Sequence, residues 1–192
     1  MVDFGIKVEN IVASVSLGVT IHLNKIVSKV EGMEYEPEQF PGLVYRIKKP
    51  KAAALVFGTG KVICTGARNM KDIKEVFNKV VKVIRSSGTK APKEFDVQVE
   101  NIVASAKIDS SLNLDTIAFK LEESEYEPEQ FPGLVYRMTK PKVAFLFFGT
   151  GKIICTGARN MKDIKEALEK VYKKLKSIGA ISKARGAISK AR

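Results

Sequence analysis

The chain lacks the features that mark several classes of protein. No run of apolar residues approaches the roughly 18 that a membrane-spanning helix needs. No N-terminal stretch joins a basic head to an apolar core and a small-residue cleavage site, which is the pattern of a secretory signal. We therefore expect a soluble, intracellular protein that has no membrane partner.

Residues that commonly carry catalysis or bind metals are scarce. The two cysteines, Cys64 and Cys155, lie inside apolar strand patterns without a Cys or His neighbour at metal-ligand spacing, so we expect both in the core. The single histidine, His22, favours a surface role because the corresponding residue of the second half is Asn113. The GTGK stretches lack the spacing of a phosphate-binding loop, and no carboxylate pair or Cys-His arrangement stands out. We therefore expect no enzyme, with no catalytic residue, no metal site and no cofactor.

Positive charge is in excess. Lys and Arg number 33 against 21 Asp and Glu, which gives a formal net charge of +12. The excess is not a detachable tail, because residues 1–91 carry 15 basic and 8 acidic residues and residues 92–192 carry 18 and 13. This balance is expected of a protein that binds a polyanion such as nucleic acid. A generally basic, soluble surface is the alternative.

The chain is one unit written twice. Four blocks recur with a single offset of 91 residues and no net insertion between them: 8–14 at 99–105, 34–46 at 125–137, 58–61 at 149–152, and 63–75 at 154–166. Solenoid repeats are shorter, about 20 to 50 residues, and need three or more copies, so this is a half-domain duplicated once. Two equal halves imply a pseudo-two-fold axis. We expect a first repeat at residues 1–91, a second repeat at 92–178, and a basic tail at 179–192 in which GAISKAR is itself doubled.

Each repeat is predicted to form five strands and two helices. In the first repeat, alternating and β-branched residues predict strands at 6–17, 34–40, 43–48, 52–57 and 61–65, the second of them an edge strand or strand end because it contains Pro37. Helical spacing predicts one helix at 23–30 and another from Asn69, a candidate N-cap, to a stop at Gly88. The order is β-α-β-β-β-β-α, an α+β fold whose mostly antiparallel sheet buries one face beneath its helices. Two repeats joined edge to edge would form one long, curved sheet with the helices on one side.

Strand parity predicts which residues lie on the free face of the sheet. If Ile11, Ala13, Val15, Val56 and Cys64 face the helices, the free face carries Asn10, Val12, Leu55, Phe57, Ile63 and Thr65, and in the second repeat Asn101, Val103, Leu146, Phe148, Ile154 and Thr156. An apolar sheet face of this size needs a partner. The cations expected around it are Arg46, Lys61, Arg68, Arg137, Lys152 and Arg159. An apolar centre with a cationic rim fits a nucleic acid whose phosphates are held from the sides; a dimer interface with merely solubilising cations is the alternative.

Four phenylalanines precede turns. Phe40 and Phe57, with Phe131 and Phe148 in the second repeat, lie next to Pro-Gly or Gly-Thr. A large ring beside a turn is exposed unless something covers it. One interpretation is an apolar wedge that is pushed between base pairs and kinks the duplex. The other is that the four rings are ordinary core aromatics.

The doubled motifs resemble those of the TATA-box-binding proteins. ENIVAS, EYEPEQFPGLVYR, the KP turn, GTGK and CTGAR each occur twice in the same order, over residues 4–178, and the EYEPEQFPG form is similar to the archaeal type. The resemblance implies a pseudo-two-fold saddle with its helices on the convex side. It also implies a general transcription initiation factor that binds the TATA element of double-stranded DNA in the minor groove. Such a protein would act in the archaeal cytoplasm at the nucleoid, or in the nucleus if eukaryotic.

The resemblance also implies roles for individual residues. Phe40 and Phe57 would form one DNA-kinking pair, and Phe131 and Phe148 the other. The minor-groove contacts would come from Asn10, Val12, Leu55, Ile63, Thr65, Asn101, Val103, Leu146, Ile154 and Thr156. The phosphate contacts would come from the six rim cations given above.

Partners follow from the same resemblance. Glu127, Glu129 and Gln130 fall in the loop that family members offer to the B-type transcription factor, which assembles with RNA polymerase; a solvated loop is the alternative, because the first repeat has the same EPEQ. The final helices carry many lysines, which could contact other factors or flanking DNA or could form a solvated face. The basic tail differs from the acidic tail that archaeal relatives often have. A homodimer off DNA and a module that binds single-stranded RNA or DNA on its sheet remain alternatives, since such modules stack bases on sheet aromatics.

Overall fold

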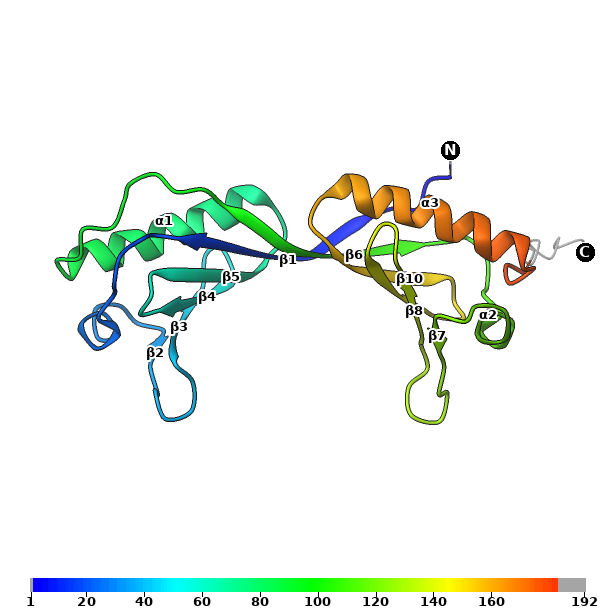
Figure 1. The fold of residues 1–192 in the computed structure, drawn as a ribbon, viewed down its shortest axis with the longest axis horizontal. Helices are drawn as coiled ribbons and strands as arrows, with labels where there is room; N and C mark the ends of the chain where they lie inside the picture. Colours follow the sequence, from blue (N-terminus) through cyan, green and yellow to red (C-terminus); the bar gives the residue numbers. More distant parts are fainter. Residues whose placement is uncertain (1, 183–192) are drawn as a thin grey trace, which may run out of the picture. The chain divides into compact units, whose positions relative to one another are not determined.

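The computed structural model describes residues 2–182, and the chain divides into two compact units (Figure 1). We call Glu9–Asn101 the first unit, and Met1–Val8 together with Ile102–Arg192 the second unit. The N-terminal residues pack in the second unit: Lys107 N donates to Phe4 O at 2.9 Å, and the Phe4 ring meets Tyr172 edge-on with centroids 5.7 Å apart. The predicted boundary between residues 91 and 92 follows the duplication of the sequence and stays a prediction.

The first unit is built on an antiparallel sheet. Its strand order is β2-β3-β4-β5-β1. The bounds are β1 (Lys7–Ser16), β2 (Met33–Glu34), β3 (Gly42–Ile47), β4 (Ala52–Phe57) and β5 (Lys61–Ala67). Four of these strands match the predicted segments to within two residues at each end, because their alternation matches the period of a strand.

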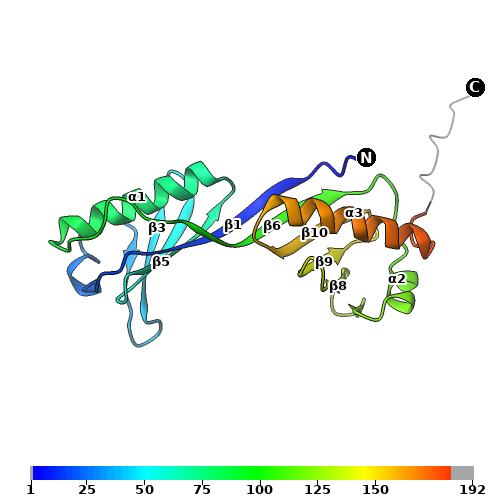
Figure 2. The ribbon, with the colours of Figure 1, turned by 45° about the horizontal axis from the view of Figure 1, so that its top comes forward.

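One long helix covers this sheet. The helix α1 (Met70–Ser86) packs against β4 and β5, and it lies along one side of the sheet in Figures 1 and 2. Asn69 is the N-cap as predicted, since its side chain accepts a hydrogen bond from Asp72 N at 2.8 Å. The helix ends before Gly88, whose φ of 91° is readily adopted only by glycine. Its buried residues are Ile73, Val76, Phe77, Val80, Val81 and Ile84.

The second unit has the same architecture. Its strand order is β6-β10-β9-β8-β7, and α3 packs against β10. The bounds are β6 (Gln98–Lys107), α2 (Leu114–Lys120), β7 (Ser124–Glu125), β8 (Leu134–Met138), β9 (Val143–Phe147), β10 (Lys152–Ala158) and α3 (Met161–Ser177). The strands β1 and β6 each contribute residues to both units. The predicted fold class, α+β with two tandem repeats and one antiparallel sheet, is confirmed.

The short helix predicted at 23–30 is wrong for the first repeat. Only a 3₁₀ turn forms there, η1 (Leu23–Lys25), whereas the second repeat forms α2 at the matching place. Asn113 caps α2 by accepting from Thr116 N at 2.9 Å, and Asp115 adds an acid to the first turn. His22, the counterpart of Asn113, makes no side-chain cap bond within the described chain. The uncapped first turn explains why the same apolar spacing does not suffice in the first repeat.

The strand predicted at 34–40 is also largely wrong. Pairing stops at Glu34, and the chain then turns, with Gln39 N and Phe40 N both donating to Glu36 O at 2.9 Å. Pro37 has no N–H to offer a ladder, so the segment forms a loop. Figure 1 shows this β2–β3 loop projecting on the side of the sheet away from α1.

Both cysteines lie in the core, as predicted. Cys64 and Cys155 are fully buried. Burial raises the pKa of each thiol from 9.0 to about 12, so both stay protonated and unreactive at neutral pH. No helix within residues 2–182 is long and apolar enough to cross a membrane.

The C-terminal segment docks beside α2. Ile181 forms a β-bridge with Leu112, and Ser182 N donates to Ser111 O at 3.0 Å. The predicted basic tail begins at Gly179, and residues 183–192 of it lie outside the described residues.

Candidate nucleic-acid interface

The sheet of the first unit has one buried and one partly exposed face. Ile11, Ala13, Val15, Val56 and Cys64 are buried, as strand parity predicted. The free-face residues Asn10, Val12, Leu55, Phe57, Ile63 and Thr65 are all half-buried, and so are their six counterparts in the second repeat. The predicted groove-contact residues of each repeat are therefore all partly accessible.

Strand register arranges these residues in rows. Val44, Leu55, Ile63 and Ser14 are consecutive partners across β3, β4, β5 and β1. The matching row of the second unit contains Val135, Leu146, Ile154 and Ser105. Sequence reasoning missed Val44 and its counterpart Val135, which are half-buried, whereas Ser14 is buried and its hydroxyl donates to Glu100 Oε1 at 2.6 Å. The alternation within 43–48 would have placed Val44 on this face, had it been extended to that strand.

Asn10 is held at a bulge. The β1–β5 register shifts between Ile11 and Ala13, next to Gly66, whose φ is 96°. Asn10 Oδ1 accepts from Gly66 N at 2.7 Å, and Asn10 Nδ2 donates to Thr65 Oγ1 at 3.2 Å. The side chain therefore satisfies an N–H that the bulge removes from the ladder. The same two bonds fix the orientation of an amide and a hydroxyl on an otherwise apolar face.

The four phenylalanines form two pairs. The rings of Phe40 and Phe57 meet edge-on with centroids 5.7 Å apart, and those of Phe131 and Phe148 do so at 6.0 Å. Phe131 is 43% exposed and the other three are half-buried. None of the four is in the core, so the interpretation as ordinary core aromatics is wrong. In each pair, one ring comes from the loop just before a strand, β3 or β8. The other ring comes from the end of the next strand, since Phe57 is the last residue of β4 and Phe148 directly follows β9.

The predicted rim cations are all exposed, and Arg46, Arg68 and Arg137 lie near carboxylates. Arg46 Nε lies 3.6 Å from Glu34 Oε1, and Arg137 Nε lies 3.6 Å from Glu125 Oε1. Arg68 Nη2 lies 3.9 Å from Glu9 Oε2. Such exposed ion pairs contribute about 0–1 kcal/mol each, so an incoming phosphate can displace the carboxylate. Lys61 and Lys152 are exposed at the first residues of β5 and β10, and Arg159 is exposed directly after β10.

The loop with Glu127, Glu129 and Gln130 joins β7 to β8. All three residues are exposed. Gln130 N and Phe131 N donate to Glu127 O at 3.0 and 2.9 Å, which repeats the turn of the first unit. The backbone turn therefore displays the acids to solvent and holds Phe131 at the loop's end.

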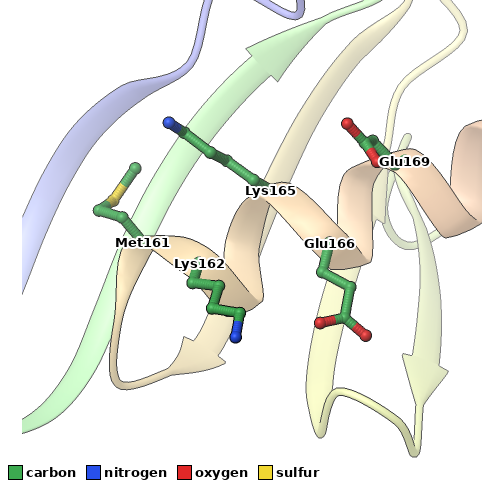
Figure 3. Close-up of a pocket in the computed structure, with 5 residues that line it drawn as sticks. All are labelled: Met161, Lys162, Lys165, Glu166 and Glu169. Atoms are coloured by element: carbon green, nitrogen blue, oxygen red, sulfur yellow. The ribbon is translucent and has the colours of Figure 1, made fainter. Parts of the chain in front are cut away.

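The outer side of α3 carries a hollow that is less clearly suited to binding than the free face of the sheet. Figure 3 shows a hollow lined by Met161, Lys162, Lys165, Glu166 and Glu169. Its charges have both signs, and Lys170 Nζ lies 2.7 Å from Glu166 Oε1, which lowers the pKa of that carboxyl. Within the part of the chain that the structure describes, no group of three His, Cys, Asp or Glu side chains could hold a metal ion. The lysines of α1 and α3 thus sit on a mixed, solvated helix surface.

Fold and free face together define a class. Each unit presents an apolar sheet face with partly exposed phenylalanines near strand ends and exposed cations beside it, and in the first unit hydrogen bonds orient the polar groups of this face. This is a duplicated, sheet-based nucleic-acid-binding protein.

Comparison with known proteins identifies the family. The family model "Transcription factor TFIID (or TATA-binding protein, TBP)" matches residues 5–87 and again 96–178. The chain therefore belongs to the TATA-binding-protein family, a family of DNA-binding transcription factors and not of enzymes.

Archaeal relatives match over nearly their whole length. The TATA-box-binding protein of Methanobrevibacter smithii is 49% identical over 94% of this chain and 100% of its own length. That of Archaeoglobus fulgidus is 48% identical over 93% of this chain and 99% of its own length. The solved structure of Methanococcus jannaschii TBP has a TM-score of 0.85 and 44% identity, covering 90% of this chain and 98% of that one.

Proposed function

We propose that this chain is a general initiation factor that binds the TATA element of promoter DNA in the minor groove through the free face of its sheet. The observation that carries the proposal is the half-buried apolar face, which has the same residues in both repeats. Its residues are too exposed to be core and too apolar to remain solvated without cost. Groove contact would remove them from water.

The polar groups of the face suit the chemistry of the minor groove. A·T pairs present only acceptors there, whereas G·C pairs add the guanine amino donor. The bonds between Asn10, Thr65 and Gly66 hold the Asn10 amide and the Thr65 hydroxyl in fixed orientation among Val12, Leu55 and Ile63. These groups would donate to A·T acceptors. A guanine amino group facing the apolar residues would lose its hydrogen bond to water, which disfavours G·C pairs.

The phenylalanine pairs would act as wedges. Inserting an apolar ring partly unstacks a base step and kinks the duplex, a mechanism for which this family is the standard example. Phe131, the most exposed of the four, has an edge-on partner in Phe148, which would support it from behind. Easily deformed TA steps lower the cost of the kink, which adds specificity at positions that no side chain contacts.

The rim cations would exchange partners on binding. Arg46, Arg68 and Arg137 would leave Glu34, Glu9 and Glu125 for phosphates, and Lys61, Lys152 and Arg159 would join them. The carboxylates beside Arg46, Arg68 and Arg137 would also weaken the attraction of the free rim for other anions. Affinity should therefore depend strongly on salt.

Assembly would follow from the β7–β8 loop. We propose that Glu127, Glu129 and Gln130 contact a B-type transcription factor, which nucleates a preinitiation complex with RNA polymerase. Their exposure and the ordered turn beneath them support this role.

Energy transfer across a TATA duplex labelled at both ends tests the wedge. We expect the distance between the labels to shorten at saturation. Phe131→Ala with Phe148→Ala should reduce the bend more than Lys165→Ala with Lys173→Ala, because the rings do the unstacking. Phe119→Ala is a matched control, since Phe119 is an exposed ring outside the free face.

Three outcomes would contradict the proposal. An unchanged distance at saturation would exclude bending. Equal losses from the phenylalanine and lysine variants would indicate binding by charge alone. Preference for single-stranded over duplex competitor would favour a sheet that stacks unpaired bases.

A further inference from the structure

We propose that α2 and the turn after it dock a positively charged protein segment that offers an apolar pocket. The surface consists of Phe119 and the carboxylates of Asp115, Glu122 and Glu123, and we call it the α2 surface. It lies outside the sheet face and outside the loop with Glu127 to Gln130. The inference goes beyond DNA binding and does not depend on it.

Phe119 lies on the solvent-exposed side of α2. Leu114, Ile117 and Leu121 are buried and form the inner side of α2, whereas Phe119 is 90% exposed. Asp115 lies one helical turn before Phe119, on the same side of the helix. A single exposed apolar residue is common on protein surfaces and proves nothing by itself. Phe119 differs from such a residue because three carboxylates lie within four positions of it in the sequence.

The two repeats differ in sequence at this surface, and the differences make the second repeat more acidic there. Asp115, Phe119 and Glu123 stand where the first repeat has Asn24, Ser28 and Gly32, and Thr116 stands where it has Lys25. Residues 114–123 carry three acids and one lysine, whereas residues 23–32 carry one acid and two lysines. The local charge therefore changes sign, to −2 from +1, in a protein whose net charge is +12. Blocks of up to 13 residues elsewhere are identical between the repeats.

A further difference removes a competing cation. In the first repeat, Lys48 Nζ donates to Glu31 Oε1 at 3.0 Å. The counterpart of Glu31 is Glu122, but the counterpart of Lys48 is Thr139. The one lysine of α2, Lys120, donates its ammonium to Ile178 O at 2.9 Å. The carboxylates of the α2 surface are therefore available to a cation on a partner, because Thr139 cannot pair with Glu122 and the ammonium of Lys120 is bonded to a backbone carbonyl.

Hydrogen bonds at both ends of α2 hold this helix in place. Asn113 N donates to Ala180 O at 2.9 Å, and the Asn113 side chain caps the helix. Ser124 Oγ donates to Leu121 O at 2.5 Å, at the end of α2. A ring held on an anchored helix loses little conformational freedom when a partner covers it. The first repeat has only a 3₁₀ turn at this place.

The sign of the charge selects the class of partner. The carboxylates of Asp115, Glu122 and Glu123, each within four positions of Phe119 in the sequence, repel the phosphates of nucleic acid and of anionic lipid, and they attract Lys and Arg. An exposed aromatic ring is a common anchor in protein interfaces, where it enters a pocket on the partner. A basic protein segment with an apolar pocket satisfies both features.

Selection from a phage-displayed library of random short peptides on the full chain tests this inference. The counter-selection target is Phe119→Ser, which installs the residue that the first repeat has at the matching place. We expect enriched peptides that combine Lys or Arg with apolar residues. The most enriched peptide, made synthetically, should bind Phe119→Ser at least about tenfold more weakly, as expected for an interface anchor.

Two further variants separate the role of charge. Glu122→Gln with Glu123→Gln should weaken the peptide severalfold, whereas Glu36→Gln with Glu38→Gln, an equal charge change in the first repeat, should not. Enriched acidic or purely apolar peptides, or binding unaffected by Phe119→Ser, would overturn the proposal. TATA bending by Phe119→Ser should equal that of the wild type, so this proposal and the DNA proposal can fail separately.

Other occupants give different results. If sedimentation shows a dimer that Phe119→Ser abolishes, the occupant is a second copy of the chain and the proposal is overturned. If the peptide binds only after Lys183, Arg185, Lys190 and Arg192 are replaced by Gln, the chain's own C-terminal segment is the occupant and the proposal is likewise overturned. A monomer whose peptide affinity those four substitutions leave unchanged supports it.

Discussion

At the scale of the residue, Gly42 and Gly133 leave room for the two phenylalanine pairs because they lack a side chain. A Cβ at Gly133 would lie 2.6 Å from Phe131 Cε1 and 3.1 Å from Phe148 Cε1, and a Cβ at Gly42 would lie 2.7 and 3.0 Å from the matching atoms of Phe40 and Phe57. All four distances are shorter than ordinary van der Waals contact. Only glycine lets both rings of a pair approach the strand end at once.

We therefore expect Gly133→Ala to weaken TATA binding and bending severalfold, about 1 kcal/mol, because the added methyl displaces both rings. Thermal stability should change little, since the rings are partly exposed and can move. Gly149→Ala is the control: its Cβ would meet only Leu112 O, at 3.7 Å. Comparable losses from both variants would show that the glycine contact with the rings is irrelevant to binding.

Residue positions were predictable to different degrees. Alternation within a strand placed Asn10, Leu55 and Ile63 on the free face, because side-chain direction is a local property of the backbone. Alternation could not show that Asn10 bonds to Gly66, or that Arg46 faces Glu34. The first contact depends on a bulge between strands distant in sequence, and the second depends on the pairing of β2 with β3.

At the scale of the element, the two repeats differ most in the short helix after their first strand. The apolar spacing that predicted a helix is the same in both, yet only the second repeat forms α2. The capping contact from Asn113 to Thr116 N decides between the two outcomes. Periodicity alone could not reveal this, since a cap acts on a few backbone groups at one end.

We expect Asn113→Ala to lower the free energy of unfolding by about 1 kcal/mol, the usual value of a lost N-cap. His22→Ala should change it by only a few tenths, because His22 makes no cap bond to the described chain. Urea denaturation followed by circular dichroism measures both. If the two variants lose equal stability, the cap is not what distinguishes α2 from η1.

At the scale of the whole molecule, the net charge of +12 predicts salt-dependent binding. Each phosphate contact contributes about 0.9 to the slope of log K against log salt concentration. Lys61→Ala with Lys152→Ala should therefore reduce the slope by about 2, whereas Lys74→Ala with Lys165→Ala, on α1 and α3, should leave it unchanged. Titrations by fluorescence anisotropy at several salt concentrations measure the slopes. Equal reductions would mean that the helices also contact DNA.

The free face is the same in both repeats at every position named above, from Asn10 and Asn101 to Thr65 and Thr156. Such a face gives the duplex no reason to bind in one direction. Direction must come from surfaces where the repeats differ, and the α2 surface is one of them.

The sequence by itself determined the duplication, the strands of the sheet, the buried side of that sheet and the family, because these follow from local periodicity and from motifs repeated at a constant offset. Only the tertiary structure decided that the phenylalanines pair above a glycine, that Asn10 is held at a bulge, that the rim arginines face carboxylates, and that Phe119 is displayed on an anchored helix. These features join residues of different strands, loops and helices. Their geometry depends on register, capping and packing, which no local pattern encodes.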